Sequence, residues 1–343
     1  MDEEVRDGIT FGTDGWRARL PEFTTARVRM VAQAVATYLD DEGVPGGVAI
    51  GYDARERSPE FAHELATVLS TNGRDVVVSE RDCPTPALAW TVARGEFAGG
   101  LVVTASHNPP EYNGVKFVPA DGTPALPAVT DELERRLEPP LSTASPEGRI
   151  EEDDIVTPYV ESVGSVLSGA FDTDVDLDGM TVAYDAMHGS GRGVTDAVLE
   201  RAGATVSRFR CERDPEFGGT PPEPAPEYAP SLVEAVTDGT ADVGFVNDGD
   251  SDRVGVVTPE RGFLDPNVVL AVVYEFLLER ASGDVVRTVS TSSLVDRIAS
   301  DHGQSVHETP VGFKWVAEAT SEHRTRELLD AGRKFVEPVV ERI

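Results

Sequence analysis

The chain has 343 residues, enough for two or three domains with buried cores. It carries 61 Asp and Glu against 30 Lys and Arg, a formal net charge of −31, while 40% of its residues are hydrophobic. The hydrophobic content excludes a wholly disordered chain, and the charge argues against a nucleic-acid-binding protein, which would need clustered Lys and Arg.

Lysine is scarce, since Lys116, Lys314 and Lys334 are the three lysines of the chain. Few lysines and many carboxylates are typical of halophilic proteins, in which a high net charge maintains solubility and concentrated salt screens the repulsion. The alternative is an acidic surface that binds a partner. We therefore interpret the acidity as a sign of environment rather than of activity.

The cysteines and the apolar segments of the chain indicate the cellular compartment of the protein. Cys83 and Cys211 lie far apart and form no C-x-x-C pattern, which indicates reduced thiols in a cytoplasmic protein. The acidic start, Met1 to Glu4, is unlike a basic signal peptide. The most apolar run, 268–278, is about half as long as a membrane helix. We expect a soluble chain with no membrane partner.

In the first part of the chain, apolar β-branched runs alternate with amphipathic stretches, as in α/β domains. Strands are predicted at 48–52, 76–78 and 101–104. A helix is predicted from Ser58, as its N-cap, to about Ser70, with Pro59 in its first turn. Residues 138–154 combine Pro-Pro, Ser, Gly and four consecutive acids, which predicts a linker.

The same alternation returns twice. Strands are predicted at 181–184, 205–206 and 241–246, a helix at 193–202 and a proline-rich loop at 221–230. A third round opens near Asn267 with a helix over 268–280, followed by a strand over 285–290. We expect this helix to be buried because it is apolar on most faces. The recurrence at intervals of about 100 residues predicts related domains.

The strongest local pattern is NDGDSDR at 247–253, directly after an apolar strand. In an extended segment alternate side chains point the same way, so Asp248, Asp250 and Asp252 can bring three carboxylates to one cation. Oxygen ligands favour Mg²⁺ or Ca²⁺ over zinc. An EF-hand is excluded, because its required Gly and Glu positions hold Arg and Pro. The alternative is an acidic solvated turn, which its place at the ligand edge of an α/β sheet disfavours.

A second pattern, TASHNPP at 104–110, also follows an apolar strand. Ser106 is placed where an exposed hydroxyl can act as a nucleophile, beside the imidazole of His107. An ordinary Ser/Asn/Pro turn is the equally weighted alternative. No G-x-S-x-G elbow is present, so α/β-hydrolase chemistry is not indicated. Lys116, shortly after this turn, stands out in a chain that otherwise avoids Lys.

Two glycine-rich turns have weaker patterns. The segment 11–18, FGTDGWRA, places Arg17 beside backbone N–H groups, a combination that suits phosphate oxygens, although a plain β-turn explains it as well. The segment 188–193, HGSGRG, lies between a strand and a helix. It lacks the G-x-G-x-x-G spacing, so a tight turn is the better interpretation.

The chain resembles the α-D-phosphohexomutase superfamily, and most closely its phosphoglucomutase/phosphomannomutase members, in four segments that occur in this order: 11–18, 104–110, 247–253 and GFKW at 312–315. The resemblance covers Ile9 to about Glu318. It implies an α/β fold of successive similar three-layer domains with mixed sheets, and an active site in the cleft between them. We expect domain I at 1–150, domain II at 151–256 and a partial domain III at 257–343.

The resemblance also implies a role for each matching residue. Ser106 would be the phosphorylated serine that exchanges a phosphoryl group with the sugar. One Mg²⁺ would be held by Asp248, Asp250 and Asp252, with a phosphate oxygen on Ser106 as a further ligand. The transferring group would be surrounded by Arg17, His107, Lys116 and Arg253. Lys116 would be the acid/base, with His107 as the second candidate. The sugar phosphate would contact Lys314 and Arg17. Phosphoryl transfer needs such positioning and neutralisation of negative charge.

The implied activity is the interconversion of hexose 1-phosphate and hexose 6-phosphate, with a hexose 1,6-bisphosphate as intermediate and activator. The sequence departs from the family in two places: a Gly-Glu-Glu-Ser-Gly sugar loop and a final domain with an Arg-x-Ser-Gly-Thr phosphate loop are missing, so we expect the fourth domain to be absent. Two alternatives follow, a non-catalytic protein that binds Mg²⁺ and phosphosugar, and a slow phosphatase in which water attacks phospho-Ser106. The sequence leaves open whether the phosphate of glucose, mannose or glucosamine is the preferred substrate, and whether the protein is a monomer or a dimer.

Overall fold

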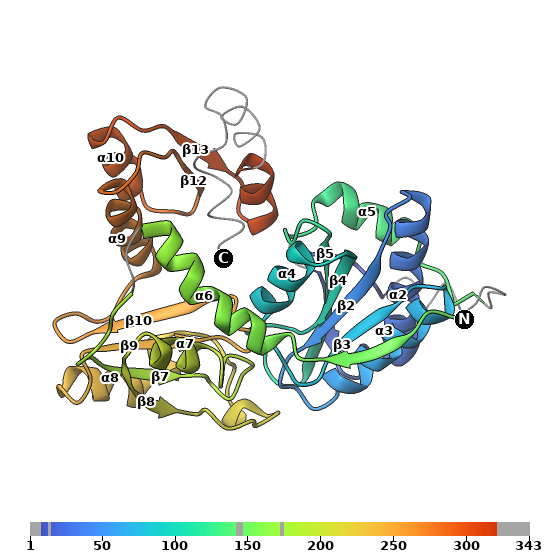
Figure 1. Cartoon of the computed structure of the whole chain (residues 1–343), viewed down its shortest axis with the longest axis horizontal. Helices are drawn as coiled ribbons and strands as arrows, with labels where there is room; N and C mark the ends of the chain where they lie inside the picture. Colours follow the sequence, from blue (N-terminus) through green and yellow to red (C-terminus); the bar gives the residue numbers. More distant parts are fainter. Residues whose placement is uncertain (1–7, 13–14, 142–146, 172–174, 321–343) are drawn as a thin grey trace.

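The computed structural model describes residues 8–12, 15–141, 147–171 and 175–320. These residues form three α/β units in chain order, which Figure 1 shows at the right, at the lower left and at the upper left. We call them the first, second and third unit. The predicted fold class, successive α/β domains with mixed sheets, is confirmed.

The first unit has a six-stranded mixed sheet in the order β1-β5-β4-β2-β3-β6. Its strands are β1 (Trp16–Arg19), β2 (Gly47–Tyr52), β3 (Val76–Ser79), β4 (Phe97–Val103), β5 (Tyr112–Pro119) and β6 (Ile150–Asp153). Its helices are α2 (Thr25–Asp41), α3 (Ser58–Thr71), α4 (Thr85–Arg94) and α5 (Pro127–Arg135). The largest apolar core lies between the sheet and the pair α2 and α3, and a second core lies beneath α4 on the other face. The unit therefore has three layers.

Two local predictions in this unit were wrong. The predicted linker includes β6, which pairs in parallel with β3 at the sheet edge. Strand pairing uses backbone groups, and charged side chains are common on an exposed edge, so four exposed residues, three of them acids, are compatible with a strand there. Ser58 is not the N-cap of α3, because its hydroxyl donates instead to Asp53 Oδ1 at 2.7 Å.

The second unit has a five-stranded mixed sheet in the order β11-β10-β9-β7-β8. Its strands are β7 (Thr181–Asp185), β8 (Thr205–Phe209), β9 (Val243–Asn247), β10 (Val254–Thr258) and β11 (Gly262–Phe263). Its helices are α6 (Val156–Phe171), α7 (Thr195–Arg201) and α8 (Pro230–Thr237). Helix α6 leads from the first unit into the second (Figure 1) and contacts both α4 and α7. The proline-rich loop contains one 3₁₀ turn, Pro226–Tyr228.

The third unit is smaller over its described residues. A parallel pair, β12 (Val285–Thr288) and β13 (Val306–Thr309), packs with α9 (Pro266–Leu278) and α10 (Leu294–Asp301). The prediction that α9 is buried was wrong, since Val272 is 60% exposed and Phe276 42%. The two strands and α10 cover one side of the helix, which includes Ala271 and Tyr274, and within the described residues its other apolar side stays exposed.

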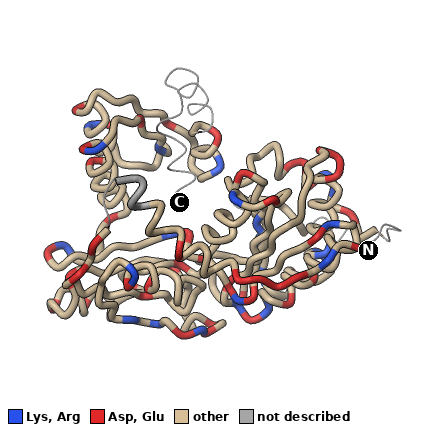
Figure 2. Tube along the Cα trace, viewed as in Figure 1, with Lys and Arg blue, Asp and Glu red and all other residues tan. Residues whose placement is uncertain are grey.

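The sheets extend past the predicted domain boundaries, because the first ends at Asp153 and the second at Phe263. The part of the predicted domain III beyond position 320, which includes Lys334, lies outside the described residues. Within the described residues, no helix is both long and apolar enough to cross a bilayer. Acidic residues are spread over all three units rather than gathered in one patch (Figure 2).

Candidate functional site

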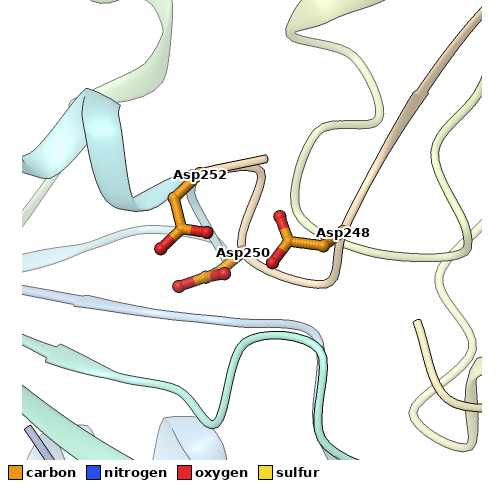
Figure 3. A group of neighbouring side chains, drawn as sticks. All are labelled: Asp248, Asp250 and Asp252. Atoms are coloured by element: carbon orange, nitrogen blue, oxygen red, sulfur yellow. The ribbon is translucent and has the colours of Figure 1, made fainter. Parts of the chain in front are cut away.

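Three carboxylates converge in the loop between β9 and β10 (Figure 3). One oxygen from each of Asp248, Asp250 and Asp252 lies within 4.8 Å of the others. The first two side chains are fully buried, and that of Asp252 is 27% exposed. Asp250 Oδ1 is buried and has no hydrogen-bond partner. A buried carboxylate oxygen without a donor is costly unless a cation or water satisfies it, so the group fits a hard divalent cation.

The electrostatics of the three acids differ. Burial, together with the charges of Asp250 and Asp252, raises the pKa of Asp248 well above its ordinary value. Burial also acts to raise the pKa of Asp250, but the charge and hydrogen bond of Lys116 outweigh it and lower that pKa. Lys116 Nζ donates to Asp250 Oδ2 at 2.9 Å and to Asp252 Oδ2 at 2.7 Å. The positive charge of Lys116 thus neutralises part of the negative charge of the three acids.

The serine loop follows β4 in the first unit and meets the acidic loop of the second. Ser106 Oγ donates to Asp248 Oδ2 at 2.7 Å. Its backbone has a φ of 52°, in the left-handed region that few non-glycine residues adopt. The sequence predicted an exposed hydroxyl, but Ser106 is fully buried. The reason is that the acidic loop covers it: a Cβ at Gly249 would lie 2.8 Å from the Ser106 carbonyl oxygen.

Further contacts fix the acidic loop against the first unit. Thr85, the first residue of α4, donates its N–H to the Asp250 carbonyl at 2.9 Å and its hydroxyl to Asp250 Oδ2 at 2.7 Å. The predicted tight turn at 188–193 supports the same loop, because Ser190 N–H donates to the Gly249 carbonyl at 3.0 Å. Contacts from both units thus hold the acidic loop beside the serine loop.

Besides Lys116, three predicted cationic or ring groups lie beside this junction. His107 Nδ1 lies 3.4 Å from Ser106 Oγ, and burial followed by the charges of Arg253 and Arg17 lowers the pKa of His107 to about 4. Arg17 Nη1 donates to Asn108 Oδ1 at 3.1 Å, within the serine loop. Arg253 N–H donates to Asp248 Oδ1 at 3.0 Å. An anion placed here would be met by several positive charges.

Lys314 lies in the third unit, where its Nζ is 5.6 Å from the centre of the Trp315 ring. Among the described residues, no hydrogen bond or ion pair joins it to the serine or acidic loop. The expected turn at 11–18 is described in part, since residues 13 and 14 lie outside the described ranges. At its Arg17 end, this turn contacts the serine loop through Asn108.

The sequence interpretation missed the contacts of three buried side chains beside the serine loop, namely Asp53, Arg55 and Thr104. Asp53 and Arg55 directly follow β2, just as Asp248 follows β9. Charged residues immediately after an apolar strand are therefore the signal that would have identified them.

Comparison with protein families covers most of the chain. Residues 8–142 match the model described as "Phosphoglucomutase/phosphomannomutase, alpha/beta/alpha domain I", residues 157–262 match domain II of the same description, and residues 265–329 match domain III. The order of the matches follows the three units of the fold.

Individual relatives agree with these matches. A probable phosphoglucosamine mutase of Methanopyrus kandleri is 35% identical over 320 residues, 92% of this chain and 68% of that protein. A phosphoglucomutase/phosphomannomutase of Thermococcus kodakarensis is 31% identical over 92% of this chain and 70% of its own. A crystal structure from Thermus thermophilus that carries the name phosphomannomutase superposes with a TM-score of 0.81 at 33% identity, over 92% of this chain and 72% of that one. The chain thus spans about two thirds of these relatives.

Proposed function

Because the chain belongs to the phosphoglucomutase/phosphomannomutase family, whose members compared above are named mutases, we propose that it is a phosphohexomutase. It interconverts hexose 1-phosphate and hexose 6-phosphate, with glucose or mannose as the sugar. Phospho-Ser106 and a hexose 1,6-bisphosphate intermediate carry the phosphoryl group. The observation that supports this most is the 2.7 Å contact of Ser106 Oγ with Asp248, which joins a nucleophile to a cluster of three acids.

In this proposal one Mg²⁺ is held by Asp248, Asp250 and Asp252, together with a phosphate oxygen on Ser106. The unsatisfied Asp250 Oδ1 and the raised pKa of Asp248 support a cation here, because both costs are relieved by a positive charge. When bound, Mg²⁺ supplies neutralisation of the negative charge that spreads over the phosphoryl oxygens.

The phosphoryl group leaves Ser106 Oγ for a hydroxyl of the sugar phosphate. The P–Oγ bond breaks and a P–O bond to the sugar forms. The proton of the sugar hydroxyl passes to a base on the protein, and Ser106 Oγ, the leaving oxygen, takes up a proton and becomes a free hydroxyl. Transfer of the other phosphoryl group of the bisphosphate back to Ser106 regenerates the phosphoserine and yields the isomeric monophosphate. We assign the proton exchange to Lys116, with His107 as the alternative.

Positive side chains around the two loops stabilise the transferring group. Arg17 and Arg253 each contact one of the loops, and their charges both act on His107. Lys314 and Arg17 are proposed to bind the phosphate that is not transferred. Positioning and charge neutralisation of this kind account for most of the catalysis of phosphoryl transfer.

A coupled assay tests the proposal. The full chain, in molar salt with Mg²⁺ and glucose 1,6-bisphosphate, is expected to convert glucose 1-phosphate or mannose 1-phosphate to the 6-phosphate. Its intact mass is expected to increase by one phosphoryl group, which peptide mapping locates at Ser106. Absence of turnover and of phosphorylation would contradict the proposal.

The same samples distinguish the alternatives. Release of inorganic phosphate from the bisphosphate without 6-phosphate product would identify a phosphatase. A rise of the melting temperature with Mg²⁺ and sugar phosphate, but no product, would identify a binding protein.

A further inference from the structure

The Arg55 guanidinium makes hydrogen bonds to the backbone of the serine loop. Arg55 Nη2 donates to the carbonyls of Ser106 at 2.8 Å and Asn108 at 2.6 Å. Its Nη1 donates to the carbonyls of Pro109 at 2.6 Å and Tyr112 at 3.0 Å. Four carbonyls of a single loop thus converge on one side chain that is 2% exposed.

Asp53 orients this guanidinium. Arg55 Nε donates to Asp53 Oδ2 at 2.9 Å, so all five N–H groups of the guanidinium have acceptors. The same Asp53 oxygen accepts from Thr104 Oγ1 at 2.8 Å, and Thr104 Oγ1 accepts the N–H of Ser106 at 2.8 Å. The Ser106 carbonyl therefore bonds directly to the Arg55–Asp53 ion pair, and the Ser106 N–H is connected to the same ion pair through Thr104.

The ion pair also contacts the second unit. The Phe217 ring lies over the guanidinium, with 5.0 Å from Arg55 Cζ to the ring centre. Arg213 Nη2 donates to the Arg55 carbonyl at 3.3 Å. Arg55 thus touches the serine loop of one unit and a loop of the other, at the place where Ser106 meets Asp248.

We propose that Arg55, oriented by Asp53, is a positioning residue that maintains the left-handed backbone of Ser106 and aims its Oγ at the acidic loop. This inference rests on the proposed function. A left-handed non-glycine residue persists where its surroundings fix it, and the five bonds of Arg55 provide that. A lysine has three N–H groups on one nitrogen and cannot reach five acceptors spread around a planar fork.

The test compares Arg55→Lys and Asp53→Asn with Arg287→Lys in the third unit. Arg287 is a matched control, because its guanidinium makes a bidentate pair with Asp296 and is also largely buried. We expect Arg55→Lys to lower kcat by about 100-fold, the scale on which a misplacement of about 1 Å acts, with KM changed by less than about threefold. Arg287→Lys is expected to change neither.

Hydrogen exchange provides a readout that does not need turnover. In Arg55→Lys and Asp53→Asn we expect faster exchange of amides 104–112, with exchange in β7 and β9 unchanged. Wild-type exchange in this loop after Arg55→Lys, or a fall of kcat no larger than the fall in folded fraction, would overturn the inference. If the wild-type chain shows no turnover, the proposed function fails, and loop exchange by itself decides whether Arg55 positions Ser106.

Discussion

Ser106 Oγ donates a 2.7 Å hydrogen bond to Asp248 Oδ2, although 142 residues separate the two in sequence and they follow strands of different sheets. The bond joins the ends of β4 and β9, the carboxyl edges where α/β sheets bind their ligands. The site is thus a property of two units packed together.

Replacement of Ser106 by alanine removes the proposed nucleophile. We expect Ser106→Ala to lower turnover by roughly 10³-fold or more, the scale found when a covalent nucleophile is lost. Phosphorylation in the intact mass is expected to disappear. The coupled assay measures the first effect and mass spectrometry the second. Ser162→Ala on α6 is the control and is expected to behave as wild type, whereas turnover by Ser106→Ala would contradict the assignment.

Metal binding depends on the buried acids. Loss of a group that only orients a ligand costs about 10–100-fold in metal affinity, so loss of a ligand is expected to cost at least as much. Asp248→Asn and Asp250→Asn should therefore abolish the rise in melting temperature that millimolar Mg²⁺ produces in the wild type. Calorimetric titration measures the affinities directly. The exposed Asp238→Asn is the control, and an unchanged Mg²⁺ response in both buried variants would exclude a metal at this cluster.

One bidentate ion pair contributes to the packing of the first two units. Arg192 donates to the two carboxylate oxygens of Asp82 at 2.5 and 2.6 Å, and both side chains are largely buried. Removal of one partner strands a buried charge, so Arg192→Met is expected to lower the free energy of unfolding by about 3–5 kcal/mol. Urea unfolding measures this loss.

The double variant Arg192→Met with Asp82→Leu tests the cause. It removes both charges and is expected to recover part of the stability that the single variant loses. If the double variant loses more unfolding free energy than the two single variants lose together, an unpaired buried charge is not the cause of the loss.

Thiol reactivity follows burial. Burial raises the pKa of the Cys83 thiol to about 12 and that of Cys211 to about 11. A raised pKa means that the reactive thiolate is scarce at pH 8, so native Cys83 is expected to resist Ellman's reagent while the unfolded chain releases both equivalents. Cys211, which is partly exposed, is expected to react slowly. Rapid reaction of two thiols in the native state would contradict this.

Salt is expected to stabilise the chain. With a net charge of −31, self-repulsion falls as the Debye length shortens from about 10 Å at 0.1 M to about 3 Å at 1 M. The melting temperature should therefore rise through the molar range of NaCl. A variant with Glu227→Gln and Glu234→Gln, both exposed, is expected to need less salt for the same melting temperature. A melting temperature independent of salt would refute the halophile interpretation.

The sequence predicted the central strands because their apolar runs are local patterns. It also placed Asp248, Asp250 and Asp252 in one cluster, although they lie in a turn, with Ser251 at a φ of 57°, and not in the extended segment that the prediction assumed. The roles given to the site residues remain predictions, since a role concerns a reaction rather than a position.

The contacts that sequence reasoning missed are long-range. Arg55 acts on carbonyls more than 50 residues away, and Thr85 meets Asp250 across 165 residues. No local spacing encodes such pairs. The strand β6 was missed for a related reason: its pairing with β3 is made by backbone groups, whereas its side chains resemble a solvated linker.

The division of the site between two sheets has a consequence for biosynthesis. A growing chain has the serine loop once β5 has emerged from the ribosome, but it lacks the acids until residue 252 is exposed as well. A nascent chain released earlier carries a serine without its electrostatic partner. The serine and its three acidic partners therefore come together only after residue 252 has been synthesised.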